Sequence, residues 1–207
     1  MFIGILGTKI GMTQIFDSKG CAIPITVIQA GPCIVTHIKT NSKDGYQAVQ
    51  IGYSQTHATK LTKAQLGHLK TSNAPALRYL HEYKINSKTN YKLGDVITVN
   101  KLKIGQLVNI SGKSIGKGFS GYQKRHKFSR GPMTHGSKNH RKPGSIGPGT
   151  TPGRVFPGKK MAGRLGGKVI TIKQLQIIDI NPELHLIAIK GSVPGPKGSL
   201  LSLKTQY

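Results

Sequence analysis

Negatively charged residues are the scarcest feature of this sequence. Six Asp and Glu stand against 31 Lys and Arg among 207 residues, which leaves a formal net charge of +25. So few carboxylates offer little from which to build a general acid–base pair, and we expect no enzyme activity. A chain this basic needs a polyanion nearby, and nucleic acid is the first candidate, ahead of anionic membrane or acidic protein.

Cysteine is also scarce. Cys21 and Cys33 are too few for a disulfide framework, and without a Cys-x-x-Cys pair they cannot hold a structural zinc ion alone. Both lie in strand-like runs, which predicts small buried hydrophobic side chains and not catalytic nucleophiles. A reducing compartment fits this usage.

Long apolar runs are missing. No stretch approaches the roughly 18 residues of a membrane span. The opening MFIGILGTKIGMTQIF has an early Lys9, no basic leading region and no cleavage site, which predicts a strand and not a signal peptide. We therefore expect a soluble protein that is used where it is made, with no membrane partner.

Short alternating runs predict a mainly β body with small helical elements. Residues 12–16 and 21–28 are expected to form a hairpin around the turn at 17–20, with Pro24 near an edge. A helix is expected in 61–70, while 76–83 fits helix or strand. Further strands are predicted at 33–40, 46–53, 95–100, 106–111, 168–174, 175–180, 185–190 and 199–204.

The excess positive charge has a definite place in the chain. No acidic residue occurs between Asp95 and Asp179, and residues 111–168 carry 14 Lys and Arg, 14 Gly and 5 Pro. Apolar residues in this segment follow neither helical nor strand spacing, so it cannot form a core. Strands on both sides imply one body interrupted by a long, irregular Gly/Lys/Arg-rich extension, which we expect to be ordered by its ligand.

Two glycine motifs in the extension resemble nucleotide-binding loops but lack the context. Gly116–Gly121 satisfies G-x-G-x-x-G, yet no amphipathic helix begins there and no acidic residue follows at the required distance. Gly153–Lys160 is one residue from a P-loop, because Lys160 stands where a Ser or Thr must bind Mg²⁺. Phosphate contact without nucleotide hydrolysis fits this second motif better, and an RNA backbone supplies such phosphates.

Histidines offer no metal site. His126, His135 and His140 have no Cys or carboxylate within the segment, and the surrounding Lys and Arg repel a cation. We expect no metal, no cofactor and no small-molecule substrate, and assign these histidines to phosphate or base contact.

RNA is a better candidate than DNA. No helix-turn-helix, zinc finger or basic-region helix fits a Gly- and Pro-rich segment, whereas an extended strand can thread through folded RNA. Without Trp, readout of the RNA backbone and shape should dominate over base stacking. A DNA-architectural protein, an NTPase and a membrane-surface protein are the weaker alternatives.

Four separated signatures resemble one known family. They are GILGTKIGMTQIF, GKGFSGYQKRHKFSRGPMTHGSKNHR, PGSIGPGTTPGRVFPGKKMAGRLGG and GSVPGPKG. In this order they resemble ribosomal protein three of the large subunit, in its bacterial and organellar form. The resemblance covers nearly the whole chain.

The resemblance implies a structural constituent of the large subunit, with a β-barrel body (residues 1–110 and 169–207) and an rRNA-binding extension (residues 111–168). It further implies binding early in assembly near the 3′ end of the rRNA, a reach toward the peptidyl transferase centre with 144–153 near the tip, and neighbours including the fourteenth and nineteenth large-subunit proteins. The expected rRNA contacts are Lys113, Lys117, Lys124, Arg125, Lys127, Arg130, His135, Lys138, His140, Arg141, Lys142, Arg154, Lys159, Lys160, Arg164 and Lys168.

One position departs from the family. Some bacterial members carry a methylated glutamine before the Thr-Pro-Gly of the tip loop, where this chain has Thr150, so that modification cannot occur here. Lys outnumbers Arg 25 to 6 and the loop around Thr150 is similar to cyanobacterial and plastid members. These features favour a plastid protein, with a bacterial one as the alternative.

Overall fold

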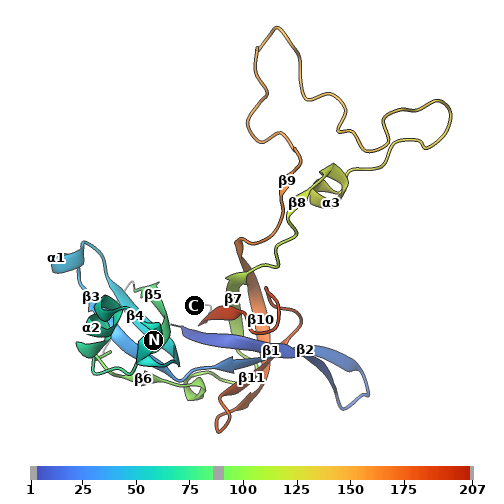
Figure 1. Ribbon diagram of the computed structural model, residues 1–207. Helices are drawn as coiled ribbons and strands as arrows, with labels where there is room; N and C mark the ends of the chain where they lie inside the picture. Colours follow the sequence, from blue (N-terminus) through green and yellow to red (C-terminus); the bar gives the residue numbers. More distant parts are fainter. Residues whose placement is uncertain (1–3, 86–90, 206–207) are drawn as a thin grey trace. The chain divides into compact units, whose positions relative to one another are not determined.

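The chain forms two compact units (Figure 1). Its structure, a computed structural model, describes residues 4–85 and 91–205. The first unit combines the chain up to Lys113 with the chain from Val169 onward, and the second is Ser114–Lys168. Strand β7 continues to Lys113, so its last three residues fall within the range 111–168 that the sequence assigned to the extension.

A closed six-stranded antiparallel barrel forms the larger part of the first unit (Figure 1). Each strand pairs with two neighbours, so the six strands close into a ring. The ring order is β1 (Ile5–Phe16), β12 (Leu200–Thr205), β7 (Leu107–Lys113), β10 (Val169–Asn181), β11 (Leu186–Lys190) and β2 (Ala22–Ala30). The predicted mainly β class is confirmed.

The predicted hairpin joins β1 and β2. Phe16 pairs with Ala22, and the antiparallel register continues back along both strands to Gly7 and Ala30. Oδ1 of Asp17 accepts hydrogen bonds from the backbone N–H groups of Lys19 (2.9 Å) and Cys21 (2.8 Å). An Asx-type turn of this kind is the reason that DSKG reverses the chain.

A second antiparallel sheet belongs to the same unit, in the order β5-β4-β3-β6. Its strands are β3 (Cys33–Lys39), β4 (Ala48–Gln55), β5 (Leu77–Lys84) and β6 (Val96–Ile97). Short helices lie between β3 and β5: α1 (Asn41–Asp44), the 3-10 turn η1 (Ala58–Lys60) and α2 (Lys63–Lys70). A second 3-10 turn, η2 (Val99–Lys101), follows β6 on the way to β7. No helix of the described residues is long and apolar enough to cross a membrane.

Helix α2 begins where the sequence predicted a helix. The Thr62 side chain accepts from the backbone N–H of Gln65, and the Gln65 side chain accepts from the backbone N–H of Thr62. This reciprocal capping box satisfies two donors that a helix start would otherwise leave unpaired. The range 76–83, open between helix and strand, contains β5.

One buried cluster joins the barrel to the second sheet. Ile5, Ile110 and Leu203 of the barrel belong to the same apolar cluster as Ile51 and Tyr83 of the second sheet. The Tyr83 hydroxyl shares a hydrogen bond of 2.7 Å with Oγ of Ser202 on β12. Burial raises the pKa of this phenol, so it stays a neutral partner.

Three predictions for the first unit need correction. Residues 168–174 and 175–180 do not form two strands, because β10 is continuous and bulges where Gln174 adopts φ 59°. The predicted strand 95–100 is reduced to the two residues of β6 followed by η2. Cys33 is buried, but Cys21 lies in the hairpin turn and is exposed, so only one of the two cysteines behaves as a buried hydrophobe.

Candidate nucleic-acid interface

The second unit starts from an antiparallel stem. The backbone N–H of Ser114 donates to the carbonyl of Lys168 (2.9 Å), and that of Lys117 donates to the carbonyl of Leu165 (2.9 Å). The pairing continues through β8 (Phe119–Ser120) and β9 (Gly163–Arg164). The two ends of a 55-residue segment are therefore tied together by backbone hydrogen bonds.

A one-turn helix, α3 (Tyr122–His126), caps the stem. The helix ends at Lys127, which adopts the left-handed conformation with φ 58°. The rings of Tyr122 and Phe128 stack with their centroids 6.0 Å apart. Arg125 Nη1 donates to the carbonyl oxygen of Met161, which also lies 2.9 Å from His126 Nε2. We call residues 114–128 and 161–168 the stem.

Beyond the stem, residues 129–160 form two loops without regular secondary structure. The first is closed by the backbone N–H of Gly131, which donates to the carbonyl of His140 (3.0 Å), and by His140 Nδ1, 2.8 Å from the carbonyl of Pro132. In 141–160 every residue except Pro143 is exposed. We call 129–160 the distal loops; they lack an apolar core of their own.

Most basic side chains of this unit face water, and the unit contains no acidic residue to pair with them. Within residues 4–85 and 91–205, the one ion pair joins Lys39 to Glu82 at 3.1 Å, in the first unit. Ser114–Lys168 contains 13 Lys and Arg and no Asp or Glu. An uncompensated field of this kind attracts polyanions and counterions.

Most of the predicted rRNA contacts are exposed. Lys113 is the last residue of β7 and belongs to the first unit. Arg125 and His140 are half-buried, and each contacts a backbone carbonyl of the second unit. The exposed ones are Lys113, Lys117, Lys124, Lys127, Arg130, His135, Lys138, Arg141, Lys142, Arg154, Lys159, Lys160, Arg164 and Lys168.

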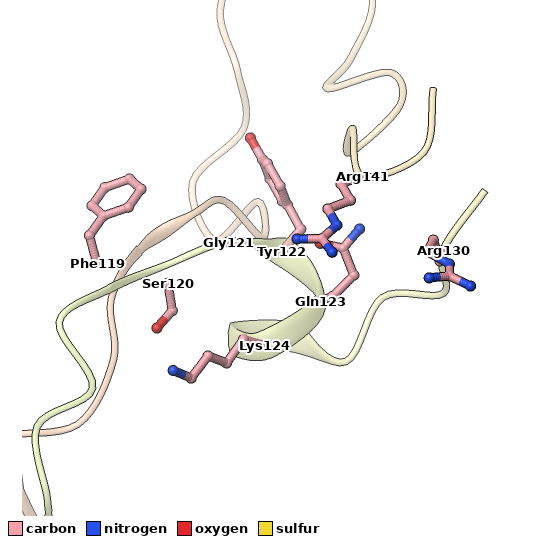
Figure 2. Close-up of a pocket in the computed structure, with 8 residues that line it drawn as sticks. All are labelled: Phe119, Ser120, Gly121, Tyr122, Gln123, Lys124, Arg130 and Arg141. Carbon is pink, nitrogen blue, oxygen red and sulfur yellow. The ribbon is translucent and has the colours of Figure 1, made fainter. Parts of the chain in front are cut away.

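The structure brings several of these residues around one open groove (Figure 2). The groove has a volume of about 810 Å³ and lies where β8 leads into α3. Figure 2 shows the side chains of Phe119 and Tyr122 pointing away from the backbone of β8 and α3. Arg130 and Arg141 come from the distal loops. Lys124 and Gln123 of α3 complete its polar lining.

Neither glycine motif has the geometry of a nucleotide-binding loop. Gly116–Gly121 contains β8 itself, so no strand–turn–helix arrangement forms there, and α3 is only five residues long. Gly153–Lys160 lies in turns, with neither a strand before it nor a helix after it. In the part of the chain that the structure describes, no three His, Cys, Asp or Glu side chains gather as a metal site.

Sequence reasoning missed two features. Gly166, with φ 72°, lies so close to the facing segment of the stem that an added Cβ would collide with the carbonyl oxygen of Ile115. In the first unit, a hollow of about 520 Å³ collects His57, Lys60 and Arg78. Arg78 lies 18 residues after Lys60 in the sequence, so the cluster becomes visible only in the fold.

Comparison with known proteins identifies the family. Residues 81–185 match the model of the family described as Ribosomal protein L3. The chain is 61% identical to large ribosomal subunit protein uL3c of Phaeodactylum tricornutum, over 98% of both chains. It is 60% identical to uL3c of Porphyra purpurea, over 98% of this chain and 99% of the relative. Identity to uL3 of the cyanobacterium Picosynechococcus sp. is 59%, over 98% and 96%.

These relatives are ribosomal proteins, which are structural components and not enzymes. These relatives include plastid-type uL3c proteins of algae as well as a cyanobacterial uL3, which favours a plastid ribosome with a bacterial one as the alternative. The match spans nearly the full length of the relatives, so it includes both the barrel and the basic second unit. The chain therefore belongs to the ribosomal protein L3 family, a constituent of the large ribosomal subunit.

Proposed function

We propose that the second unit, Ser114–Lys168, anchors the protein to large-subunit rRNA. The observation that carries this proposal is the charge: 13 Lys and Arg with no Asp or Glu, on a segment whose distal loops are almost wholly exposed. Such loops bury too little apolar surface to stabilise themselves, so a polyanion that surrounds them supplies the missing stabilisation.

The proposed mechanism is counterion release. Lys and Arg side chains neutralise converging rRNA phosphates and free the cations condensed on them, which favours binding at low salt. If about eight phosphates are contacted, log K should fall with log salt at a slope of about −6 to −7. Glycines in the loops let the backbone pass close to RNA where side chains would collide.

The finer assignments follow the family resemblance. We propose that the protein binds early in assembly, near the 3′ end of the rRNA, and that the loop 144–153 reaches toward the peptidyl transferase centre. The fourteenth and nineteenth large-subunit proteins are the proposed protein neighbours. The exposure of 141–160, with only local hydrogen bonds, supports a segment that is ordered inside RNA.

Two matched full-length variants test the anchor. The first replaces six exposed lysines of the second unit by Gln: Lys124, Lys127, Lys138, Lys142, Lys159 and Lys160. The control replaces six exposed lysines of the first unit: Lys19, Lys43, Lys60, Lys63, Lys70 and Lys103. Both lower the net charge equally, from +25 to 25 − 6 = +19.

Binding to a 3′ fragment of large-subunit rRNA is then measured across a salt series. We expect the first variant to lose most of the affinity and about 4 units of slope, at about 0.7 per contact, while the control loses little. Equal losses would show that only total charge matters and would overturn the proposal. Equally tight binding to duplex DNA would favour a DNA-architectural protein instead.

A further inference from the structure

Strand β8 presents its two side chains in an unusual way. Successive residues of a strand point to opposite faces, and apolar residues normally take the inner one. In β8 the phenyl ring of Phe119 is 81% exposed, whereas its polar neighbour Ser120 is only 2% exposed. Among the large hydrophobic side chains of the described residues, Phe119 has the highest exposed fraction.

The exposure of Phe119 does not come from a loose backbone. Phe119 pairs with Arg164 across β8 and β9, and the N–H of Leu165 donates to the carbonyl of the preceding Gly118 (3.0 Å). The ring pairs of the stem do not include Phe119, because Phe128 lies with its ring centroid 6.0 Å from those of Tyr122 and His126. The fold therefore holds a phenyl ring toward solvent in a fixed place.

Cations line the same groove as this ring or lie on the paired strand. Arg164 lies directly opposite Phe119 in the β8–β9 ladder, so both side chains leave the same face. The groove that Phe119 lines also receives Lys124, Arg130 and Arg141, and the carboxamide of Gln123 (Figure 2). A flat apolar surface bordered by cations matches a nucleotide, whose base has a π-face and whose phosphate is anionic.

We propose that this groove binds one unpaired nucleotide of the rRNA, with its base stacked on Phe119 and its flanking phosphates held by Arg130, Arg141 and Arg164. The inference rests on the proposed rRNA binding and adds a specific site to it. It also revises the expectation that stacking is minor, since one platform is sufficient to select an extruded base. A protein partner fits less well, because docking an apolar surface here would bury several unpaired cations.

The first experiment compares full-length Phe119→Leu and Phe119→Tyr with the unaltered chain on the 3′ rRNA fragment, across a salt series. Leucine keeps the apolar bulk but not the π-face, so we expect its affinity to fall about 5- to 150-fold at every salt concentration, with the slope unchanged. Tyrosine should bind as the original does. Because the ring is exposed, neither substitution removes a buried contact, and circular dichroism checks the fold.

The second experiment uses the absence of tryptophan. Phe119→Trp places a single indole in the groove, and Phe16→Trp, at a ring that is 65% exposed in the first unit, serves as the control. Addition of the rRNA fragment should quench the fluorescence of the first strongly and that of the second weakly. Stacking on a base is the interaction that this difference reports.

The possible outcomes distinguish a failure of the nucleotide site from a failure of the proposed rRNA anchor. The nucleotide site is overturned if Phe119→Leu binds as tightly as the unaltered chain, or if both tryptophans are quenched equally. In that case, a steep salt dependence of the unaltered chain still supports the rRNA anchor. If the unaltered chain itself binds without salt dependence, the proposed anchor is overturned and the site with it.

Discussion

Arg125 donates a hydrogen bond from Nη1 to the carbonyl oxygen of Met161, 36 residues later in the chain. The guanidinium also lies against Gly163, where an added Cβ would stand 2.6 Å from the same nitrogen. A residue expected to bind RNA is thus already used to close the stem. Its neighbour Lys124, on the same turn of α3, is exposed.

These neighbours allow charge and structure to be separated. We expect Arg125→Ala and Lys124→Ala to reduce the salt slope of RNA binding by similar amounts, at most about 0.9 each. Only Arg125→Ala removes a hydrogen bond from a charged donor, which should speed amide exchange at Lys117 and Leu165 about tenfold. Hydrogen-exchange mass spectrometry of the free protein measures this, and equal exchange in the two variants would contradict it.

The close approach of Gly166 to Ile115 leads to a second prediction about the stem. Gly166→Ala and Gly158→Ala both place alanine at positive φ, 72° and 81°, which costs about 1 kcal/mol each. At Gly158 the space around a new Cβ is open, whereas at Gly166 it meets the Ile115 carbonyl. We expect Gly166→Ala to open the stem, by more than about 3 kcal/mol in total, and Gly158→Ala to leave it closed.

Limited proteolysis distinguishes the two glycine variants. Opening the stem exposes the backbone between Ser114 and Gly118, so Gly166→Ala should be cut there faster than the unaltered chain. Cleavage confined to the distal loops in both variants would show that the close approach at Gly166 does not hold the stem.

The Glu82 carboxylate predicts a pH dependence for the first unit. It accepts a hydrogen bond from the Tyr46 hydroxyl (2.8 Å) and lies 3.1 Å from Lys39 Nζ, and these contacts lower its pKa below the usual 4.5. A lowered carboxyl pKa gives stability that is present above the unfolded value and is lost as pH falls through the folded value. Because Glu82 is partly exposed, we expect about 1 kcal/mol or less.

Melting temperatures between pH 7 and pH 3 test this window. Glu82→Gln should melt a few degrees below the unaltered chain at pH 7, and the gap should close as the pH falls below about 4.5. Asp44→Asn, at an exposed carboxyl of α1, is the control. A gap that is constant with pH would show that the carboxylate charge is not what stabilises the sheet.

The two cysteines should differ in reactivity. Burial raises the pKa of the Cys33 thiol to about 12, against the smaller effect of its hydrogen bond to the Leu6 carbonyl, while Cys21 is exposed. Since the thiolate is the reactive form, iodoacetamide at pH 8 should label Cys21 alone. Intact mass should show one adduct in the folded protein, none in Cys21→Ser, and two after denaturation. Fast labelling of folded Cys21→Ser would contradict the buried position of Cys33.

Local signals explain why much of the body could be predicted from sequence. The Asp17 turn and the Thr62 cap act within four residues, so their effect is visible in the sequence itself. The bulge at Gln174 is different: its N–H binds Oδ1 of Asn109 on the neighbouring strand, 65 residues away. The sequence predicted two strands that meet at this point, because a partner so far along the chain could not be foreseen.

The candidate site likewise has one part that the sequence predicts and another that it does not. Its place in the chain was predictable because composition alone concentrates the charge in one segment. The roles of Arg125 in closing the stem and of Phe119 in the groove could not be predicted. They depend on the pairing of Phe119 with Arg164 and on the position of Met161 beside α3. Spacing within the motif GKGFSG says nothing about which of its residues faces water.

The order of strands in the barrel bears on how the protein is made. Strand β12 lies between β1 and β7, so the ring stays open until the last of its strands in chain order has been synthesised. Contacts such as Ile5 with Leu203 join the two ends of the described chain and form late. The basic segment leaves the translating ribosome before the body can close, so it is accessible to an anion while the barrel is still incomplete.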